Sequence, residues 1–104
     1  MCGIVCAFNI KGNNEIVRSN VLKMAQKVRH RGPDWSGIYS SNNAILAHER
    51  LAIVDPTSGK QPILSEDGLK AIAVNGEIYN HKILRETFAS DYNFRTESDC
   101  EVLL

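Results

Sequence analysis

The sequence is poor in cysteine, and the few cysteines it has are irregularly spaced. They lie at positions 2, 6 and 100, an odd number that excludes a fully paired disulfide framework and favours reduced thiols in the cytoplasm. Cys2 and Cys6 have the spacing C-x-x-x-C, but no second pair of ligands accompanies them. We therefore predict no disulfide scaffold and no metal site.

The sequence also lacks an excess of charge of either sign. Lys and Arg together number 12, as do Asp and Glu, so the formal net charge is zero. A balanced charge gives no electrostatic basis for binding nucleic acid or an anionic membrane. No stretch approaches the ~20 apolar residues that a membrane-spanning helix needs. We predict that the chain binds neither nucleic acid nor a membrane.

Glycine and proline are scarce as well. Only 7 Gly and 3 Pro occur among 104 residues, 43% of which are hydrophobic, and this composition is typical of a globular chain of at most one domain. Near the end, Ser98 and Glu101 have the spacing of a helix-capping box, an apolar run follows, and the sequence stops. Because so short a helix is marginal alone, we expect residues 1–104 to form one partial domain, truncated at its C-terminal end.

What the sequence does contain is a mixture of strand and helix patterns. Apolar and β-branched runs predict strands, and apolar residues at helical spacing predict helices. The predicted strands are 2–10, 37–40, 44–54, 63–64 and 69–74, with a loop at 55–62; the predicted helices are 15–29, capped by Asn14, and 81–90, capped by Asn80 and apolar along Ile83, Leu84 and Phe88. This order is typical of an α+β fold.

Cys2 directly follows the initiator methionine. If Met1 is removed, one residue carries both a thiol and a free α-amine. The α-amine has a reference pKa of about 7.7–8.0, so it can act as a base for the thiol near neutral pH. From its position alone, however, Cys2 is better explained as a small core residue that begins a strand.

Two further polar groups interrupt apolar strands. His48, Glu49 and Arg50 are consecutive, so at least one of them faces inward, because strand side chains alternate between faces. Arg50 suits two-point binding of a carboxylate, although an internal ion pair with Glu49 or another acid explains it equally well. Asn75 and Gly76 could supply an amide and a backbone N–H to a developing oxyanion, but the local pattern favours a tight turn.

Taken together, several segments resemble the glutaminase domain of class II glutamine amidotransferases, which are N-terminal-nucleophile hydrolases. They occur in family order along nearly the whole chain, and within the family segments 49–51 and 98–101 are most similar to the asparagine synthetases. The segments are Met1-Cys2-Gly3-Ile4, Arg29-His30-Arg31-Gly32-Pro33-Asp34, His48 through Asp55, Asn75 through His81, and Ser98-Asp99-Cys100-Glu101-Val102.

The resemblance implies a fold and a set of roles. The fold is an αββα sandwich of antiparallel sheets, of which this chain holds the front part. Cys2, freed of Met1, attacks the side-chain amide of glutamine and forms a glutamyl thioester, while Asn75 and Gly76 form the oxyanion hole. The implied substrate-binding residues are Arg50 for the α-carboxylate, Asp99 for the α-ammonium, Glu77 nearby, and the segment Leu51, Ala52, Ile53 and Val54.

The resemblance also implies partners beyond this segment. The ammonia would pass to a separate synthetase domain that uses ATP and magnesium to make asparagine from aspartate, and we expect no cofactor in residues 1–104. Two alternatives stay open at this point. The chain could be an inactive structural fragment that self-associates as a homo-oligomer to cover an exposed sheet face. It could also come from another class II enzyme, such as those making amino sugars, purine precursors or glutamate.

Overall fold

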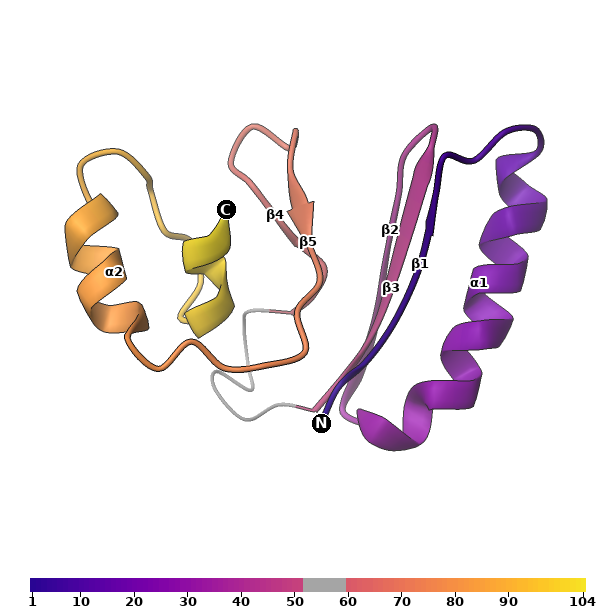
Figure 1. Ribbon diagram of the computed structural model, residues 1–104, viewed down its shortest axis with the longest axis horizontal. Coiled ribbons are helices and arrows are strands. Elements are labelled where there is room, and N and C mark those ends of the chain that lie inside the picture. Colours follow the sequence, from indigo (N-terminus) through magenta and orange to yellow (C-terminus); the bar gives the residue numbers. More distant parts are fainter. Residues whose placement is uncertain (52–59) are drawn as a thin grey trace.

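The computed structural model describes residues 1–51 and 60–104, and within them it contains two antiparallel sheets and several helices. The elements are β1 (Gly3–Phe8), α1 (Asn14–Val28), the 3-10 helix η1 (Arg29–Arg31), β2 (Trp35–Ser40), β3 (Ala44–Arg50), β4 (Ile63–Leu64), β5 (Ala71–Ile72), α2 (His81–Phe88) and the 3-10 helix η2 (Asp99–Leu103). Along the long axis, Figure 1 shows α1, then the three-stranded sheet, then the β4–β5 hairpin, then η2 and α2. The predicted α+β class with antiparallel sheets is confirmed.

β3 is the central strand of the three-stranded sheet, whose order is β1-β3-β2. Its residues from Ile45 to Arg50 are all buried, because β1 and β2 flank it, α1 covers one face, and the site described below covers the other. Ile45 and Ala47 pack against Val21 and Ala25 of α1 to form the hydrophobic core. The core therefore lies on one face of the sheet, and residues of β3 with the other parity face the site.

α1 forms almost where the periodicity predicts it, but with a different cap. The side chain of Asn13, not Asn14, accepts a hydrogen bond from the Glu15 backbone N–H at 2.9 Å. The Asn14 amide instead donates to the Ser41 carbonyl at 2.7 Å, which ties the start of the helix to the β2–β3 turn. Within α1, Ala25 is buried against the sheet and the neighbouring Met24 is exposed.

Glycine permits one close approach that bears on the site. A Cβ placed on Gly37 of β2 would lie 2.0 Å from the backbone oxygen of Gln61. The segment that precedes β4 can therefore pack directly on the three-stranded sheet only because position 37 has no side chain.

The C-terminal part departs most from the predictions. Asn80 occupies the cap position of α2 but makes no side-chain capping bond, and the predicted apolar face is not buried, since Ile83 and Phe88 are exposed. Ser98 caps η2 as predicted, accepting from the Cys100 N–H at 3.3 Å.

Glu101 does not complete the predicted capping box. Its buried carboxylate accepts backbone N–H groups of Arg95 and Thr96, each at 2.8 Å. Burial acts to raise the pKa of Glu101, but these bonds and one from the Thr96 hydroxyl outweigh it and leave the pKa below its ordinary value. Glu101 thus holds the loop that leads into η2.

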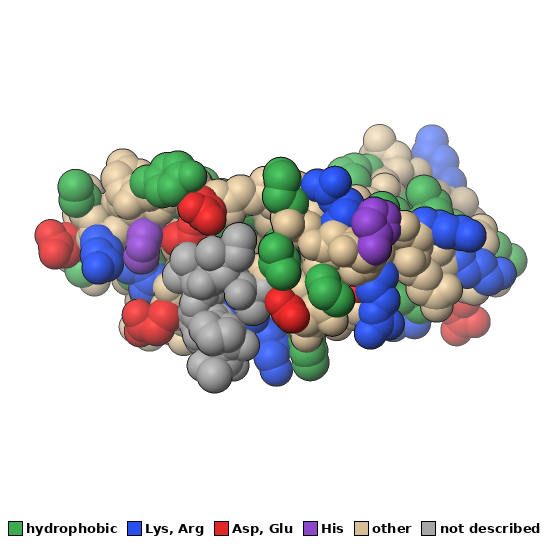
Figure 2. Space-filling model, turned by 90° about the horizontal axis from the view of Figure 1, so that it is seen from below, with side chains coloured by type: hydrophobic (Ala, Val, Ile, Leu, Met, Phe, Trp, Pro, Cys, Tyr) green, Lys and Arg blue, Asp and Glu red, His purple; other side chains and the backbone are tan. Residues whose placement is uncertain are grey.

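The surface agrees with the balanced composition. Figure 2 shows acidic, basic and apolar side chains interspersed over one face instead of gathered by type. Within residues 1–51 and 60–104, no helix has both the length and the apolar character required to cross a membrane.

Candidate active site

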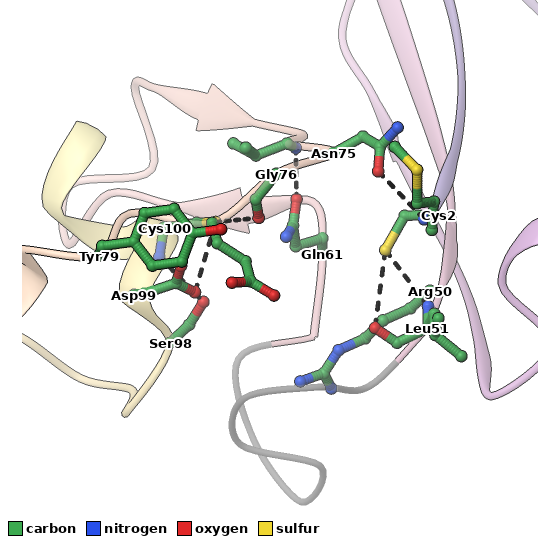
Figure 3. Close-up of a pocket in the computed structure, with 13 residues that line it drawn as sticks. Cys2, Arg50, Leu51, Gln61, Asn75, Gly76, Tyr79, Ser98, Asp99 and Cys100 are labelled. Carbon is green, nitrogen blue, oxygen red and sulfur yellow. Dashed lines mark hydrogen bonds between the residues drawn. The ribbon is translucent and has the colours of Figure 1, made fainter.

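Cys2 lies at the entry to β1, where several groups fix both its thiol and its backbone. The Leu51 N–H, directly after β3, donates to the thiol sulfur at 3.3 Å, and the thiol lies 3.7 Å from the Leu51 carbonyl (Figure 3). The carbonyl of Cys2 accepts a hydrogen bond from Arg31 Nε at 3.1 Å. Because its side chain turns toward the second sheet and away from the α1 core, Cys2 is not the buried core residue that its position alone suggests.

Asn75 approaches the Cys2 backbone from the segment that follows β5. Its side-chain oxygen accepts the Cys2 N–H at 3.1 Å, across 73 residues of sequence. This contact orients the amide so that its NH₂ group remains available as a donor. The local prediction of a tight hairpin turn at Asn75–Gly76 is wrong, because this segment runs from β5 to α2 and the β4–β5 hairpin turns at Ser65–Gly68 instead.

A cavity of about 220 Å³ lies between these groups, with Cys2 and Arg50 on one side and Asp99 on the opposite side (Figure 3). The Arg50 and Asp99 side chains are both almost fully buried, and Asp99 Oδ2 accepts the Ile78 N–H at 2.6 Å. A cation and an anion thus face one cavity from opposite sides. The predicted site residues that line it are Cys2, Arg50, Leu51, Asn75, Gly76, Glu77 and Asp99.

The remaining predicted substrate-binding residues, Ala52, Ile53 and Val54, lie outside the described residues. The predicted loop at 55–62 lies outside them as far as position 59.

The run of polar residues on β3 is buried throughout. His48, Glu49 and Arg50 are each at most 5% exposed, which confirms that at least one faces inward. Glu49 accepts a hydrogen bond from the Ser36 hydroxyl, and His48 Nε2 lies 3.0 Å from the Val74 carbonyl. Burial is the main cause that lowers the pKa of His48, so its ring is neutral at physiological pH.

Sequence reasoning missed Gln61 and Tyr79, which also line the cavity. The Gln61 side chain is buried and accepts the Val74 N–H at 2.5 Å, whereas Tyr79 is exposed at the rim. Neither carries a local signal, because Gln61 lies in a loop by composition and Tyr79 continues an apolar pattern. Within residues 1–51 and 60–104, no cluster of three or more His, Cys, Asp or Glu side chains could hold a metal ion.

Cys100 follows Asp99 in η2, lines the same cavity and is buried. Burial and the neighbouring Asp99 carboxylate raise the pKa of Cys100 to about 12. The thiol therefore stays protonated at neutral pH, and a protonated thiol is a poor nucleophile.

Iodoacetamide at neutral pH is accordingly expected to modify Cys100 last. Cys6 is exposed and Cys2 is half-buried, while Cys100 is both protonated and inaccessible. Peptide mass spectrometry over a time course would measure the order, with urea-unfolded protein as the control in which all three react. Equal labelling of Cys100 and Cys6 in the folded protein would contradict this assignment.

Comparison with known proteins places this site in context. Residues 1–104 match the family described as "Glutamine amidotransferase domain". The chain is 54% identical over 103 residues to the glutamine-hydrolyzing asparagine synthetase 2 of Arabidopsis thaliana, covering 99% of this chain and 18% of that protein. It is 53% identical over 104 residues to the glutamine-hydrolyzing asparagine synthetase B of Escherichia coli (strain K12), covering 100% of this chain and 19% of that protein.

The similarity extends to fungi, with 50% identity over 104 residues to a probable asparagine synthetase of Schizosaccharomyces pombe, again covering 19% of that protein. The chain therefore spans less than a fifth of the length of these relatives. Since the family match and these identities extend over the whole chain, the chain belongs to the glutamine amidotransferase domain family.

Proposed function

We propose that this chain hydrolyses glutamine to glutamate and ammonia, with Cys2 as an N-terminal nucleophile. The observation that carries the proposal is the contact of the Cys2 backbone nitrogen with the Asn75 side chain at the edge of a cavity faced by Arg50 and Asp99. This contact brings together a thiol, an amide donor and two opposite charges, which are the groups needed to bind glutamine and to hydrolyse its side-chain amide.

In the proposed reaction, removal of Met1 turns the Cys2 nitrogen into an α-amine. The amine takes the thiol proton, and the thiolate attacks the amide carbon of glutamine. The developing oxyanion accepts hydrogen bonds from the Asn75 amide and the Gly76 N–H. The protonated amine then gives its proton to the departing NH₂, so ammonia leaves and a γ-glutamyl thioester remains. Water attacks the thioester, releasing glutamate and restoring the thiol.

The hydrogen bond from Cys2 to Asn75 supports this sequence of steps. A neutral α-amine keeps N–H groups, so it can still donate to Asn75 Oδ1 after Met1 is removed. That bond would orient the amine relative to its own sulfur. The Leu51 N–H, which donates to the sulfur at 3.3 Å, would favour the thiolate.

The two ends of the cavity suit the rest of the substrate. Arg50 presents a planar pair of donors for the α-carboxylate of glutamine, and Asp99 presents a carboxylate for its α-ammonium. Glu77 lines the same cavity beside Gly76 and would contribute a second negative charge near that ammonium. Leu51 lines the cavity and would contact the aliphatic part of glutamine, whereas Ala52, Ile53 and Val54, also proposed to bind substrate, lie outside the described residues.

The names of the relatives extend the proposal to the protein that carries this domain. They are called glutamine-hydrolyzing asparagine synthetases. We infer that the ammonia serves asparagine synthesis from aspartate in a separate synthetase domain, which would bind the ATP and magnesium. We further infer residence in the cytoplasm, as the unpaired cysteines favour, and an αββα sandwich, as the order of layers in Figure 1 favours.

The proposed function makes Met1 removal the deciding condition. Protein with Met1 removed is expected to release glutamate and ammonia from glutamine, whereas protein that retains Met1 has its α-amine locked in a peptide bond and should not. Intact mass defines the two forms, a coupled glutamate assay measures their turnover, and light scattering reports self-association. Absence of turnover from the Met1-free form of the intact protein would favour the alternative of an inactive, associating structural domain.

A further inference from the structure

The backbone of Val74, the residue before Asn75, forms hydrogen bonds with side chains instead of with a neighbouring strand. β5 ends at Ile72, so Val74 lies beyond the strand ladder. Its N–H donates to Gln61 Oε1 at 2.5 Å, and its carbonyl lies 3.0 Å from His48 Nε2 (Figure 3 shows the Gln61 bond). The backbone N–H and the carbonyl of Val74 are therefore both held by side chains, and neither is held by a neighbouring strand within the described residues.

His48 is built for this contact. The carbonyl of Val74 can only accept, so Nε2 carries the ring proton and Nδ1 is the unprotonated nitrogen. The ring is fully buried, and among the described residues its Nδ1 atom makes no hydrogen bond. Within that part of the chain, the hydrogen bond to Val74 is thus the one polar interaction that offsets the free-energy cost of burying this imidazole, so we infer that holding Val74 is the role of His48.

The neighbours of His48 bring Gln61 to the same place. In the sheet register His48 pairs with Ile4 on one side and Gly37 on the other. Gly37 is the position where a Cβ would meet the Gln61 backbone at 2.0 Å. The missing side chain at Gly37 thus lets Gln61 approach the sheet beside His48. The Gln61 and His48 side chains can then both hydrogen-bond to the backbone of Val74.

We propose that His48 and Gln61 are positioning residues that set the distance between Asn75 and Cys2 by clamping the Val74 peptide. The proposal deepens the proposed function and rests on it, since Asn75 is there a donor to the oxyanion. Asn75 follows Val74 directly, and β3 carries His48 and ends at Arg50, just before the Leu51 that contacts the Cys2 thiol. β3 therefore leads into the residue that contacts the Cys2 thiol and also carries His48, which aligns the oxyanion donor Asn75.

The kinetic test compares His48→Leu, which removes the bond, with His48→Gln, whose amide can place a donor near the position of Nε2. His48→Leu is expected to lower kcat for glutamine about tenfold or more with KM changed less, because misplacing a catalytic donor by about 1 Å can cost a hundredfold. His48→Gln should recover most of that loss. Ile45→Val is the matched control, since it weakens the opposite face of the same strand and should leave kcat unchanged.

Hydrogen exchange supplies a readout that does not need glutamine turnover. In the intact protein, amides of residues 73–77 should exchange faster in His48→Leu than in wild type and return toward wild type in His48→Gln. Gln61→Met, which removes the other bond, should loosen the same segment if His48→Leu does not fold. A wild type that exchanges as expected but does not hydrolyse glutamine would defeat the proposed function alone. Unchanged exchange in the folded variants, or equal defects in His48→Gln and His48→Leu, would overturn the clamp.

Discussion

Replacing Cys2 with alanine is expected to abolish glutamine hydrolysis. Alanine keeps the backbone nitrogen of position 2 and its bond to Asn75 but removes the sulfur that forms the thioester in the proposed reaction. The longer protein that carries the domain should still make its product from free ammonia, because the chemistry lost concerns only the release of ammonia from glutamine. Rates with glutamine and with ammonium salts, measured on the same preparation, would check the prediction.

Cys6→Ala is the matched control for this change. Cys6 lies on β1, which begins directly after Cys2; it is exposed and does not line the cavity, so its replacement should leave glutamine turnover intact. Loss of both glutamine-dependent and ammonia-dependent activity in Cys2→Ala would indicate that Cys2 has a structural role at the edge of β1. Retained hydrolysis would exclude it as the nucleophile.

Replacing Asn75 with alanine is expected to lower kcat for glutamine about a hundredfold or more while KM stays nearly constant. Loss of one oxyanion-hole donor typically removes about 3 kcal/mol of stabilisation, which the transition state experiences and the bound substrate does not. Asn75→Ala also removes the acceptor for the Cys2 N–H, so the fall in kcat should be larger than the loss of an oxyanion donor alone would cause. Steady-state kinetics of the intact protein would separate kcat from KM.

Asn80→Ala serves as the comparison for Asn75→Ala. Asn80 lies on the same connection but makes no capping bond, so the substitution should change neither kcat nor KM by much. A large rise in KM without a fall in kcat for Asn75→Ala would place Asn75 in ground-state binding. Unchanged turnover would remove it from the reaction.

Local patterns predicted most elements around the three-stranded sheet. β1, α1 and the β2–β3 hairpin follow from apolar periodicity and turn residues, because each element carries its own periodic pattern whichever element it packs against. The predicted cap was off by one residue because Asn13 and Asn14 are adjacent and chemically identical. Which of them caps depends on Ser41, which engages the other.

Contacts distant in sequence explain what local patterns could not predict. The hydrogen bond between Cys2 and Asn75 spans 73 residues of sequence. Local sequence therefore favoured a hairpin turn at Asn75 and Gly76 over a role as oxyanion donors. Only the order of the family segments joined Cys2, Arg50, Asn75 and Asp99 into one site. Gln61 left no local trace, because its role depends on the absence of a side chain at Gly37 in another strand.

The most direct test of the proposed nucleophile is the mass of the protein during turnover. Met1-free protein is mixed with glutamine, quenched in acid within the time of a single turnover, and digested. The expected product is the N-terminal peptide with an added γ-glutamyl group on Cys2, a group that is absent from Cys2→Ala and is removed by hydroxylamine. Hydrolysis of glutamine by protein that retains Met1, or an adduct on another residue, would contradict it.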